Sequence, residues 1–146
     1  MCNLRRFEVS PAKSTVCVID DDLDVLGSLQ FLLEADGFDV CTFRSGAAML
    51  NTAVSDCVDC FVIDYKMPNM NGIDLASHLR NRNIASPIIL ITGDPDENIS
   101  VRAAVAGIRH VLRKPHLEES LVMQIRGAIQ EILPDRPRSS ASDDLR

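Results

Sequence analysis

The sequence predicts an α/β fold on three observations. Short apolar segments rich in β-branched residues recur along the chain, and a segment with helical hydrophobic spacing follows each of them. The apolar segments lack polar alternation, which is typical of strands covered on both faces. The chain has 146 residues with 46% hydrophobic content, enough for one domain with its own core. Together these features indicate βαβ units and a parallel sheet between two layers of helices.

The first strand and helix set the pattern. Residues 15–20, TVCVID, are apolar and β-branched up to a terminal aspartate, which predicts a buried strand. Leucines at three- and four-residue spacing predict an amphipathic helix over residues 22–36, with Asp22 as its N-cap and Gly37 as its stop signal. The beginning of the chain therefore predicts one complete βα unit.

The second and third units repeat this order. FDVCTF, residues 38–43, predicts a short strand, and residues 45–54 predict a helix with a serine at its start. CFVID, residues 60–64, predicts a third strand, followed by a helix over residues 72–82. The composition of NMNG, residues 69–72, predicts a turn and a helix entry.

The last two units complete five strands and five helices. PIILIT, residues 87–92, leads to a predicted helix over residues 95–106. RHVLR, residues 109–113, leads through a Lys-Pro pair to a helix over residues 117–133. We therefore predict a flavodoxin-like (βα)5 fold, a doubly wound parallel five-stranded sheet, with 2-1-3-4-5 as its simplest strand order.

The predicted domain organisation is one folded unit with two short extensions. Residues 1–13 form a short N-terminal arm, and residues 14–133 form the folded domain. Residues 134–146, PDRPRSSASDDLR, are rich in proline, serine and charge, so we expect a disordered tail. On this pattern the chain has no room for an output domain.

The composition disfavours two kinds of partner. A formal net charge of −6 and a pI near 4.9 disfavour direct binding to nucleic acid, which requires neutralisation of phosphates. The sequence has no apolar run near the roughly 18 residues that a membrane span requires. The N-terminal segment MCNLRRFEVS has no apolar signal-peptide core, so we expect a cytoplasmic protein that does not act at a membrane.

Charged and hydroxyl side chains stand at the carboxyl ends of four predicted strands. They are Asp20, Asp21 and Asp22 after the first strand, Asp64 in the third, Thr92 in the fourth and Lys114 after the fifth. The carboxyl ends of parallel strands share one edge, so these groups should converge there. Carboxylates so close together repel one another, which indicates a cation between them.

The types of ligand at this edge indicate a particular chemistry. A set of oxygen ligands without Cys or His favours a hard ion, and Mg²⁺ commonly combines one or two carboxylates with a phosphate oxygen. Lys114 would place a positive charge on phosphoryl oxygens, and the Thr92 hydroxyl would donate a hydrogen bond to one of them. Asp64 is then the nucleophile that forms an aspartyl-phosphate.

Four sequence blocks at these strand ends carry a family resemblance. VIDDD, VIDYKMPNMNG, ILITG and LRKP resemble the signature blocks of the receiver domain of bacterial two-component response regulators, in the CheY-like superfamily. The resemblance extends over residues 14–133, and DYKMPNMNG followed by ITGDPD is most similar to FixJ-type receivers. It implies a stand-alone receiver, because the sequence pattern leaves no output domain.

The resemblance implies a role for each site residue. Asp64 matches the phosphorylated aspartate, Asp20 and Asp21 match the acidic pair at Mg²⁺, and the backbone carbonyl of Lys66 matches a further metal ligand. Thr92 matches the switch hydroxyl and Lys114 the conserved-type lysine, which a cis proline follows in the family, here Pro115. Lys66 and Asp94 match positions that influence the lifetime of the phosphoryl group.

One position departs from the family pattern. Many receivers have Tyr or Phe three residues before the lysine, and here that residue is Val111. In the family the ring turns inward when the hydroxyl residue moves toward the phosphate. A valine has a single stiff torsion and cannot move in this way. The output mechanism of this chain is therefore open.

The resemblance also implies partners. We expect a sensor histidine kinase or a histidine phosphotransfer protein as phosphoryl donor and a downstream protein target in trans, with autophosphorylation and autodephosphorylation at Asp64 as the only catalysis. The last two helices and the last strand leave open a homodimer. Their arginines, Arg102, Arg109, Arg113 and Arg126, form either a partner surface or a solvated charged face.

Three alternatives remain at this stage. A degenerate receiver could act as a phosphate-independent docking module, and Val111 favours it. A haloacid-dehalogenase-like phosphatase also uses an aspartate nucleophile, Mg²⁺ and lysine, but has an acid where this chain has Lys66. A flavodoxin-like cofactor binder would need a phosphate loop after the first strand, where this chain has three acids.

Overall fold

A parallel sheet of five strands organises the molecule. The computed structural model describes residues 13–53, 57–114 and 118–132. The strands are β1 (Thr15–Ile19), β2 (Asp39–Phe43), β3 (Cys60–Asp64), β4 (Ile88–Thr92) and β5 (His110–Arg113). All paired strands are parallel, and their order is β2-β1-β3-β4-β5, so the predicted fold class and strand order are confirmed.

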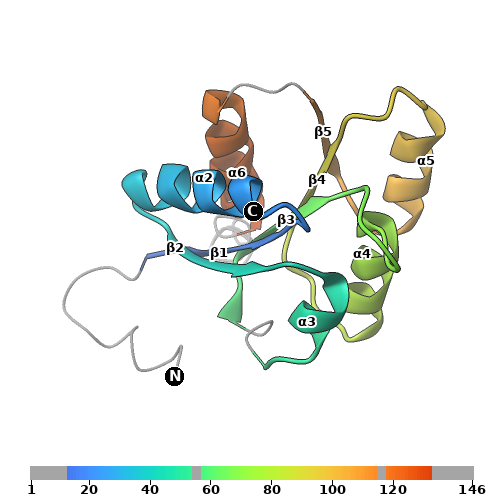
Figure 1. Cartoon of the computed structure of the whole chain (residues 1–146), viewed down its shortest axis with the longest axis horizontal. Coiled ribbons are helices and arrows are strands. Elements are labelled where there is room, and N and C mark those ends of the chain that lie inside the picture. The colour runs from blue at the N-terminus through green and yellow to red at the C-terminus, as the bar shows by residue number, and fades with distance from the viewer. Residues whose placement is uncertain (1–12, 54–56, 115–117, 133–146) are drawn as a thin grey trace, which may run out of the picture.

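Helices cover both faces of this sheet (Figure 1). The helices are α2 (Leu23–Ala35), α3 (Gly46–Leu50), α4 (Gly72–Asn81), α5 (Asn98–Val105) and α6 (Glu118–Ile132). Helices α2 and α6 lie on one face, and α3, α4 and α5 lie on the other. The three layers explain why the central strands have no polar alternation, since helices cover both faces of the sheet.

Successive strand residues belong to different halves of the core. In β3, Phe61 and Ile63 pack in the half under α3, α4 and α5, whereas Val62 packs in the half under α2 and α6. Leu75 of α4 and Leu33 of α2 are both fully buried, one in each half. Burying a side chain of this size contributes about 1.5–3 kcal/mol, so the two halves together hold the sheet and helices in register.

Side-chain caps fix where several helices begin. The Asp22 carboxylate accepts hydrogen bonds from the backbone N–H groups of Asp24 and Val25, which confirms it as the N-cap of α2. Asn71 and Asp74 form a capping box at the start of α4. The NMNG turn therefore leads into a capped N-terminus of α4, in the loop that follows β3.

Two helices are shorter than predicted. The predicted helix over residues 45–54 ends at Leu50, because the Leu50 carbonyl accepts a hydrogen bond from Arg82 Nη1 at 2.9 Å and the next residues turn. The predicted helix over residues 95–106 begins only at Asn98. Before it, the carboxylates of Asp94 and Asp96 each accept from the N–H two residues later, and such turns compete with helix.

Some predictions concern segments outside the described residues. These are the arm up to residue 12, the tail over residues 134–146 and the cis bond that the family resemblance implies at Pro115. Within the parts of the chain that are described, no helix combines the length and apolarity that crossing a bilayer requires.

Candidate functional site

The strand ends bring the predicted site residues together. Asp20 directly follows β1, Asp64 ends β3, Thr92 ends β4 and Lys114 directly follows β5. One carboxylate oxygen from each of Asp20, Asp21 and Asp64 lies within 4.8 Å of the others. Lys114 Nζ lies 3.0 Å from Asp64 Oδ1. The sheet edge is thus an acidic cluster with one ammonium group on the Asp64 carboxylate.

The two buried carboxylates are in an unfavourable environment for charge. Asp20 and Asp64 are each 6% exposed, whereas Asp21 is exposed. Burial raises the pKa of Asp20 to about 6, opposed by a hydrogen bond from the Asp22 N–H and increased by the charge of Asp64. Burial also raises the pKa of Asp64, and the bond with Lys114 opposes it. A cation shared by these oxygens would relieve this strain.

The Thr92 hydroxyl lies at the same edge and has one proton to donate. Thr92 is 2% exposed, and its Oγ1 accepts a hydrogen bond from the Asp94 N–H at 3.0 Å. The Thr92 carbonyl accepts from the Lys114 N–H at 2.8 Å, which ties the lysine to the end of β4. The hydroxyl is therefore free to donate a hydrogen bond to an acceptor group attached to Asp64.

Gly72 fixes the backbone next to Asp64, a role that sequence reasoning missed. A Cβ at residue 72 would lie 2.7 Å from the Asp64 carbonyl oxygen and 2.6 Å from Leu90 Cδ1. The Gly72 N–H also donates to the Tyr65 carbonyl at 2.8 Å. A glycine after a turn is an ordinary helix-entry signal, and only the three-dimensional distance reveals that this one must lack a side chain.

Lys66 and Asp94 follow the strand ends that carry the cluster, whereas Val111 lies within β5. Lys66 has an exposed side chain two residues after Asp64, and Asp94 is half-buried two residues after Thr92. The Asp94 carbonyl accepts from Arg113 Nη1 at 2.9 Å. Val111 lies on β5 and packs against the core half under α3, α4 and α5. The metal-ligand role of the Lys66 carbonyl stays a prediction.

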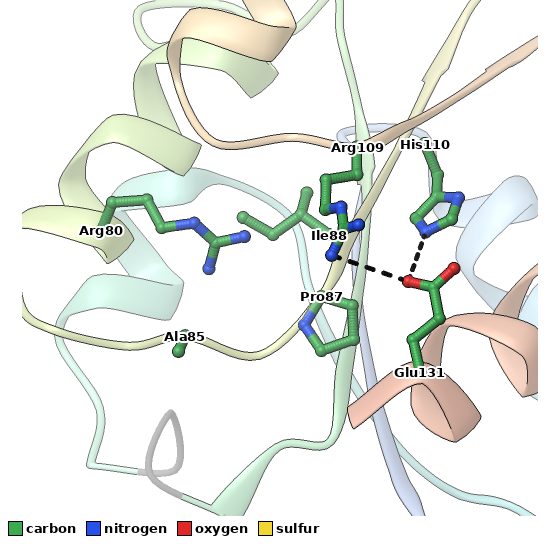
Figure 2. Close-up of a pocket in the computed structure, with 7 residues that line it drawn as sticks. All are labelled: Arg80, Ala85, Pro87, Ile88, Arg109, His110 and Glu131. Atoms are coloured by element: carbon green, nitrogen blue, oxygen red, sulfur yellow. Dashed lines mark ion pairs between the residues drawn. The ribbon is translucent and has the colours of Figure 1, made fainter. Parts of the chain in front are cut away.

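A small pocket lies at the opposite end of the sheet (Figure 2). Pro87 and Ile88 at the start of β4 line it, together with Arg109 and His110 at the start of β5. Its cavity volume is about 50 Å³, room for about one or two water molecules. It is too small for a metabolite and too far along the strands to belong to the acidic cluster.

The polar side chains of this pocket make contacts within the fold, although His110 Nε2 is a buried nitrogen with no hydrogen-bond partner among the described residues. Glu131 Oε1 lies 3.6 Å from His110 Nε2 and 3.9 Å from Arg109 Nη1, and both contacts are drawn in Figure 2. Arg80 donates to the backbone carbonyls of Ile84, Ser86 and Gly107 at 2.7–2.8 Å. These groups tie α4 and α6 to the loops, so we assign them a structural role.

The comparisons with known proteins decide the family. The profile of the response regulator receiver domain matches residues 16–126. The chain belongs to this family. The match includes β1 except its first residue, all of β2 to β5 and every residue of the acidic cluster, and it confirms the resemblance that the four sequence blocks indicated.

Individual relatives agree with this assignment. Nodulation protein W of Bradyrhizobium diazoefficiens is 34% identical over 88% of this chain and 56% of its own length. Transcriptional regulatory protein FixJ of the same species is 32% identical over 91% of this chain and 65% of its length. The receiver thus spans less than two thirds of these relatives. A receiver domain protein from Clostridium thermocellum superposes with TM-score 0.75 at 30% identity, over 81% of this chain and 95% of that one.

Proposed function

We propose that this receiver accepts a phosphoryl group on Asp64 from a sensor histidine kinase or a histidine phosphotransfer protein. The observation that carries the proposal is the Asp64 carboxylate, 6% exposed, with Lys114 Nζ at 3.0 Å and two further carboxylates within 4.8 Å. An Asp64 oxygen forms a bond to phosphorus while the phosphorus–nitrogen bond of the donor histidine breaks. The imidazole nitrogen retains the electron pair of that bond.

The same proposal includes a magnesium ion. Asp20, Asp21 and Asp64 would hold it with the Lys66 carbonyl, and this all-oxygen ligand set fits Mg²⁺. When bound, it would neutralise charge on the phosphoryl oxygens. Lys114 holds a fixed positive charge at the acceptor, and Thr92 offers its hydroxyl proton to a phosphoryl oxygen. Catalysis by the chain is then limited to phosphorylation and dephosphorylation of its own Asp64.

We further propose that the signal is a change in protein–protein binding. The domain spans residues 14–133 and acts in trans on a downstream protein target in the cytoplasm. Val101 and Val105 of α5 are 62% and 85% exposed, which supports a partner or a second copy at α5, β5 and α6. Arg126 belongs less to this surface than the sequence suggested, because it donates to the Asp36 carboxylate and carbonyl at the end of α2.

A second candidate is a receiver that works without phosphate. Val111 supports it, because a residue with one stiff torsion cannot follow the state of Asp64 as an aromatic ring can. The family match gives no comparable support to a phosphatase of the haloacid-dehalogenase type or to a flavodoxin-like cofactor binder.

Intact mass after incubation with Mg²⁺ and acetyl phosphate separates the two candidates. An Asp64 oxygen would attack phosphorus, and acetate would leave with the electrons of the broken bond. We expect one phosphoryl group on the wild type and none on Asp64→Asn. Asp59→Asn is the matched control, since Asp59 precedes β3 at its other end and accepts a hydrogen bond from the Thr15 N–H. A wild type that stays unmodified in every metal condition contradicts the phosphoacceptor function.

A further inference from the structure

A side-chain bridge joins the end of β3 to α5. Tyr65 directly follows Asp64, and its hydroxyl accepts a hydrogen bond from Arg102 Nη2 at 2.7 Å. The Arg102 guanidinium carbon also lies 5.7 Å from the centroid of the Tyr65 ring, within cation–π range. The residue next to the candidate phosphoacceptor thus holds a residue in the middle of α5.

The backbone of Tyr65 is held from two sides. Its N–H donates to the Ile91 carbonyl of β4 at 2.8 Å, and its carbonyl accepts from the Gly72 N–H at the start of α4, also at 2.8 Å. The ring is half-buried and packs against the core half under α3, α4 and α5. The β3 end of the bridge is therefore firm, and a relative movement of α5 must stretch or break the hydrogen bond.

A second connection runs from Thr92 to the beginning of the same helix. The Asp94 N–H donates to Thr92 Oγ1 at 3.0 Å, the Asp96 N–H donates to Asp94 Oδ1 at 3.0 Å, and the Asn98 N–H donates to Asp96 Oδ1 at 2.9 Å. Asn98 is the first residue of α5. A chain of three hydrogen bonds therefore links the Thr92 hydroxyl to the N-terminus of the helix that Arg102 attaches to Tyr65.

The two connections oppose each other once Asp64 carries a phosphoryl group. Such a group carries about two negative charges in place of the single charge of the carboxylate, and it brings three strong acceptor oxygens. A hydrogen bond from Thr92 to a charged oxygen is roughly twice as strong as a neutral one. Movement of Thr92 toward Asp64 would therefore pull the start of α5, whereas the Tyr65–Arg102 bridge holds its middle in place.

We propose that Tyr65 and Arg102 form a latch that holds α5 in its unphosphorylated position. This inference rests on the proposed function at Asp64. The latch would couple the state of Asp64 to the surface of the domain, a role that Val111 cannot take. Tyr65 and Val111 pack against the same half of the core. The latch stabilises only the unphosphorylated position of α5. Removing it therefore lowers the free energy needed to move α5 to its phosphorylated position, and this favours phosphorylation. Tyr65 and Arg102 are positioning residues, since neither transfers the phosphoryl group.

The test measures the initial rate of phosphoryl addition by intact mass, with Mg²⁺ and acetyl phosphate. The donor of this hydrogen bond is a guanidinium, but the bond is exposed to solvent, so we take the ordinary net contribution of a hydrogen bond, which corresponds to about a two- to ten-fold change. We therefore expect Arg102→Ala and Tyr65→Phe to react about two- to ten-fold faster than wild type. Arg102→Lys retains a donor and should return toward the wild-type rate. Arg109→Ala is the control, since Arg109 is 77% exposed and contacts Glu131 at the other end of the sheet.

Two further readouts report on α5 and on the ring. Hydrogen exchange over residues 98–105 should be faster in unphosphorylated Arg102→Ala than in wild type. The chain has one tyrosine and no tryptophan, so its ultraviolet fluorescence reports Tyr65 alone. Phosphorylation of the wild type should increase the quenching of this fluorescence by acrylamide, and Asp64→Asn should show no change.

The possible outcomes test the latch separately from the proposed phosphorylation of Asp64. A wild type that gains a phosphoryl group, with Arg102→Ala and Tyr65→Phe reacting no faster, overturns the latch and leaves the phosphoacceptor intact. Unchanged exchange over residues 98–105 in Arg102→Ala overturns it as well. A wild type that gains no phosphoryl group overturns the proposed function, and the latch with it.

Discussion

At the scale of single residues, the acidic cluster lowers the stability of the folded state. Asp20 and Asp64 are nearly buried, and each would hold its charge more easily in water, as their raised pKa values indicate. Lys114 compensates only in part, because it contacts one oxygen of Asp64 and its side chain is 44% exposed. A cation bound at this cluster would therefore stabilise the folded state.

Asp20→Asn tests this view of the cluster. Because the raised pKa means that folding disfavours the charged form above about pH 6, the neutral amide should stabilise the metal-free protein, by about 1 kcal/mol after allowance for solvent screening. The stabilisation by Mg²⁺ should shrink at the same time. Urea unfolding in a chelator and in excess Mg²⁺ measures both effects. A metal-free variant less stable than wild type would contradict the assigned repulsion.

At the scale of elements, the sequence predicted the positions of strands and helices where these depend on local residue patterns. The five strands were located to within about a residue because each is a short segment rich in apolar and β-branched residues. The predicted end of α3 was wrong, because Arg82, from outside that helix, binds the Leu50 carbonyl where the helix stops. The predicted start of α5 was also wrong, because the turns at Asp94 and Asp96 come before the helix. The acidic cluster could be predicted because strand ends share an edge, whereas the Tyr65–Arg102 contact spans 37 residues and left no pattern.

Contacts between distant elements set the role of Arg126. Its guanidinium donates to the Asp36 carboxylate and, at 2.8 Å, to the Asp36 carbonyl, and it lies 4.9 Å from the Phe38 ring centroid. Arg126 thus binds α6 to the end of α2 on one face of the sheet. From the sequence, a basic residue in the last helix equally suggested a partner surface.

The close approach of α4 to β3 gives a second prediction. Gly72→Ala places a methyl group 2.6–2.7 Å from Leu90 Cδ1 and the Asp64 carbonyl, so the chain must shift at the acceptor. We expect a loss of about 1–3 kcal/mol in the free energy of unfolding. Gly27→Ala is the control, because a Cβ there has open space within helix α2, and it should gain about 0.5–1 kcal/mol. Denaturant unfolding of both variants checks the pair, and equal stabilities would contradict the steric account.

At the scale of the whole molecule, the two ends of the sheet have different tasks. The carboxyl end of the strands gathers the acidic cluster and Lys114, whereas the amino end is closed by Arg80, His110 and Glu131 through contacts within the fold. Both ends are built on the same buried strands. Under the proposed function, the chemistry is concentrated at one edge, and the helix layers beside it would be the route by which a change there reaches the surface.

The exposed valines of α5 give the prediction at this scale. If phosphorylation assembles a homodimer through α5, β5 and α6, Val105→Glu should prevent it and leave phosphorylation of Asp64 unchanged, since Val105 is 85% exposed. Phe31→Glu is the matched control, because Phe31 is 77% exposed on α2 in the other helix layer. Light scattering after acetyl phosphate treatment measures the assembly. A dimer that persists in Val105→Glu and disappears in Phe31→Glu would move the interface to α2.

The central claim is that Asp64 is the residue that carries the phosphoryl group. Borohydride reduces an acyl phosphate to an alcohol, so treatment of the acetyl phosphate-modified protein should convert residue 64 to homoserine, and peptide mass spectrometry can locate the change. We predict that the change lies in the peptide that contains residues 60–72 and that it requires Mg²⁺. Reduction at Asp20 or Asp21 instead, or at no carboxylate in a protein that remains folded, would contradict the account.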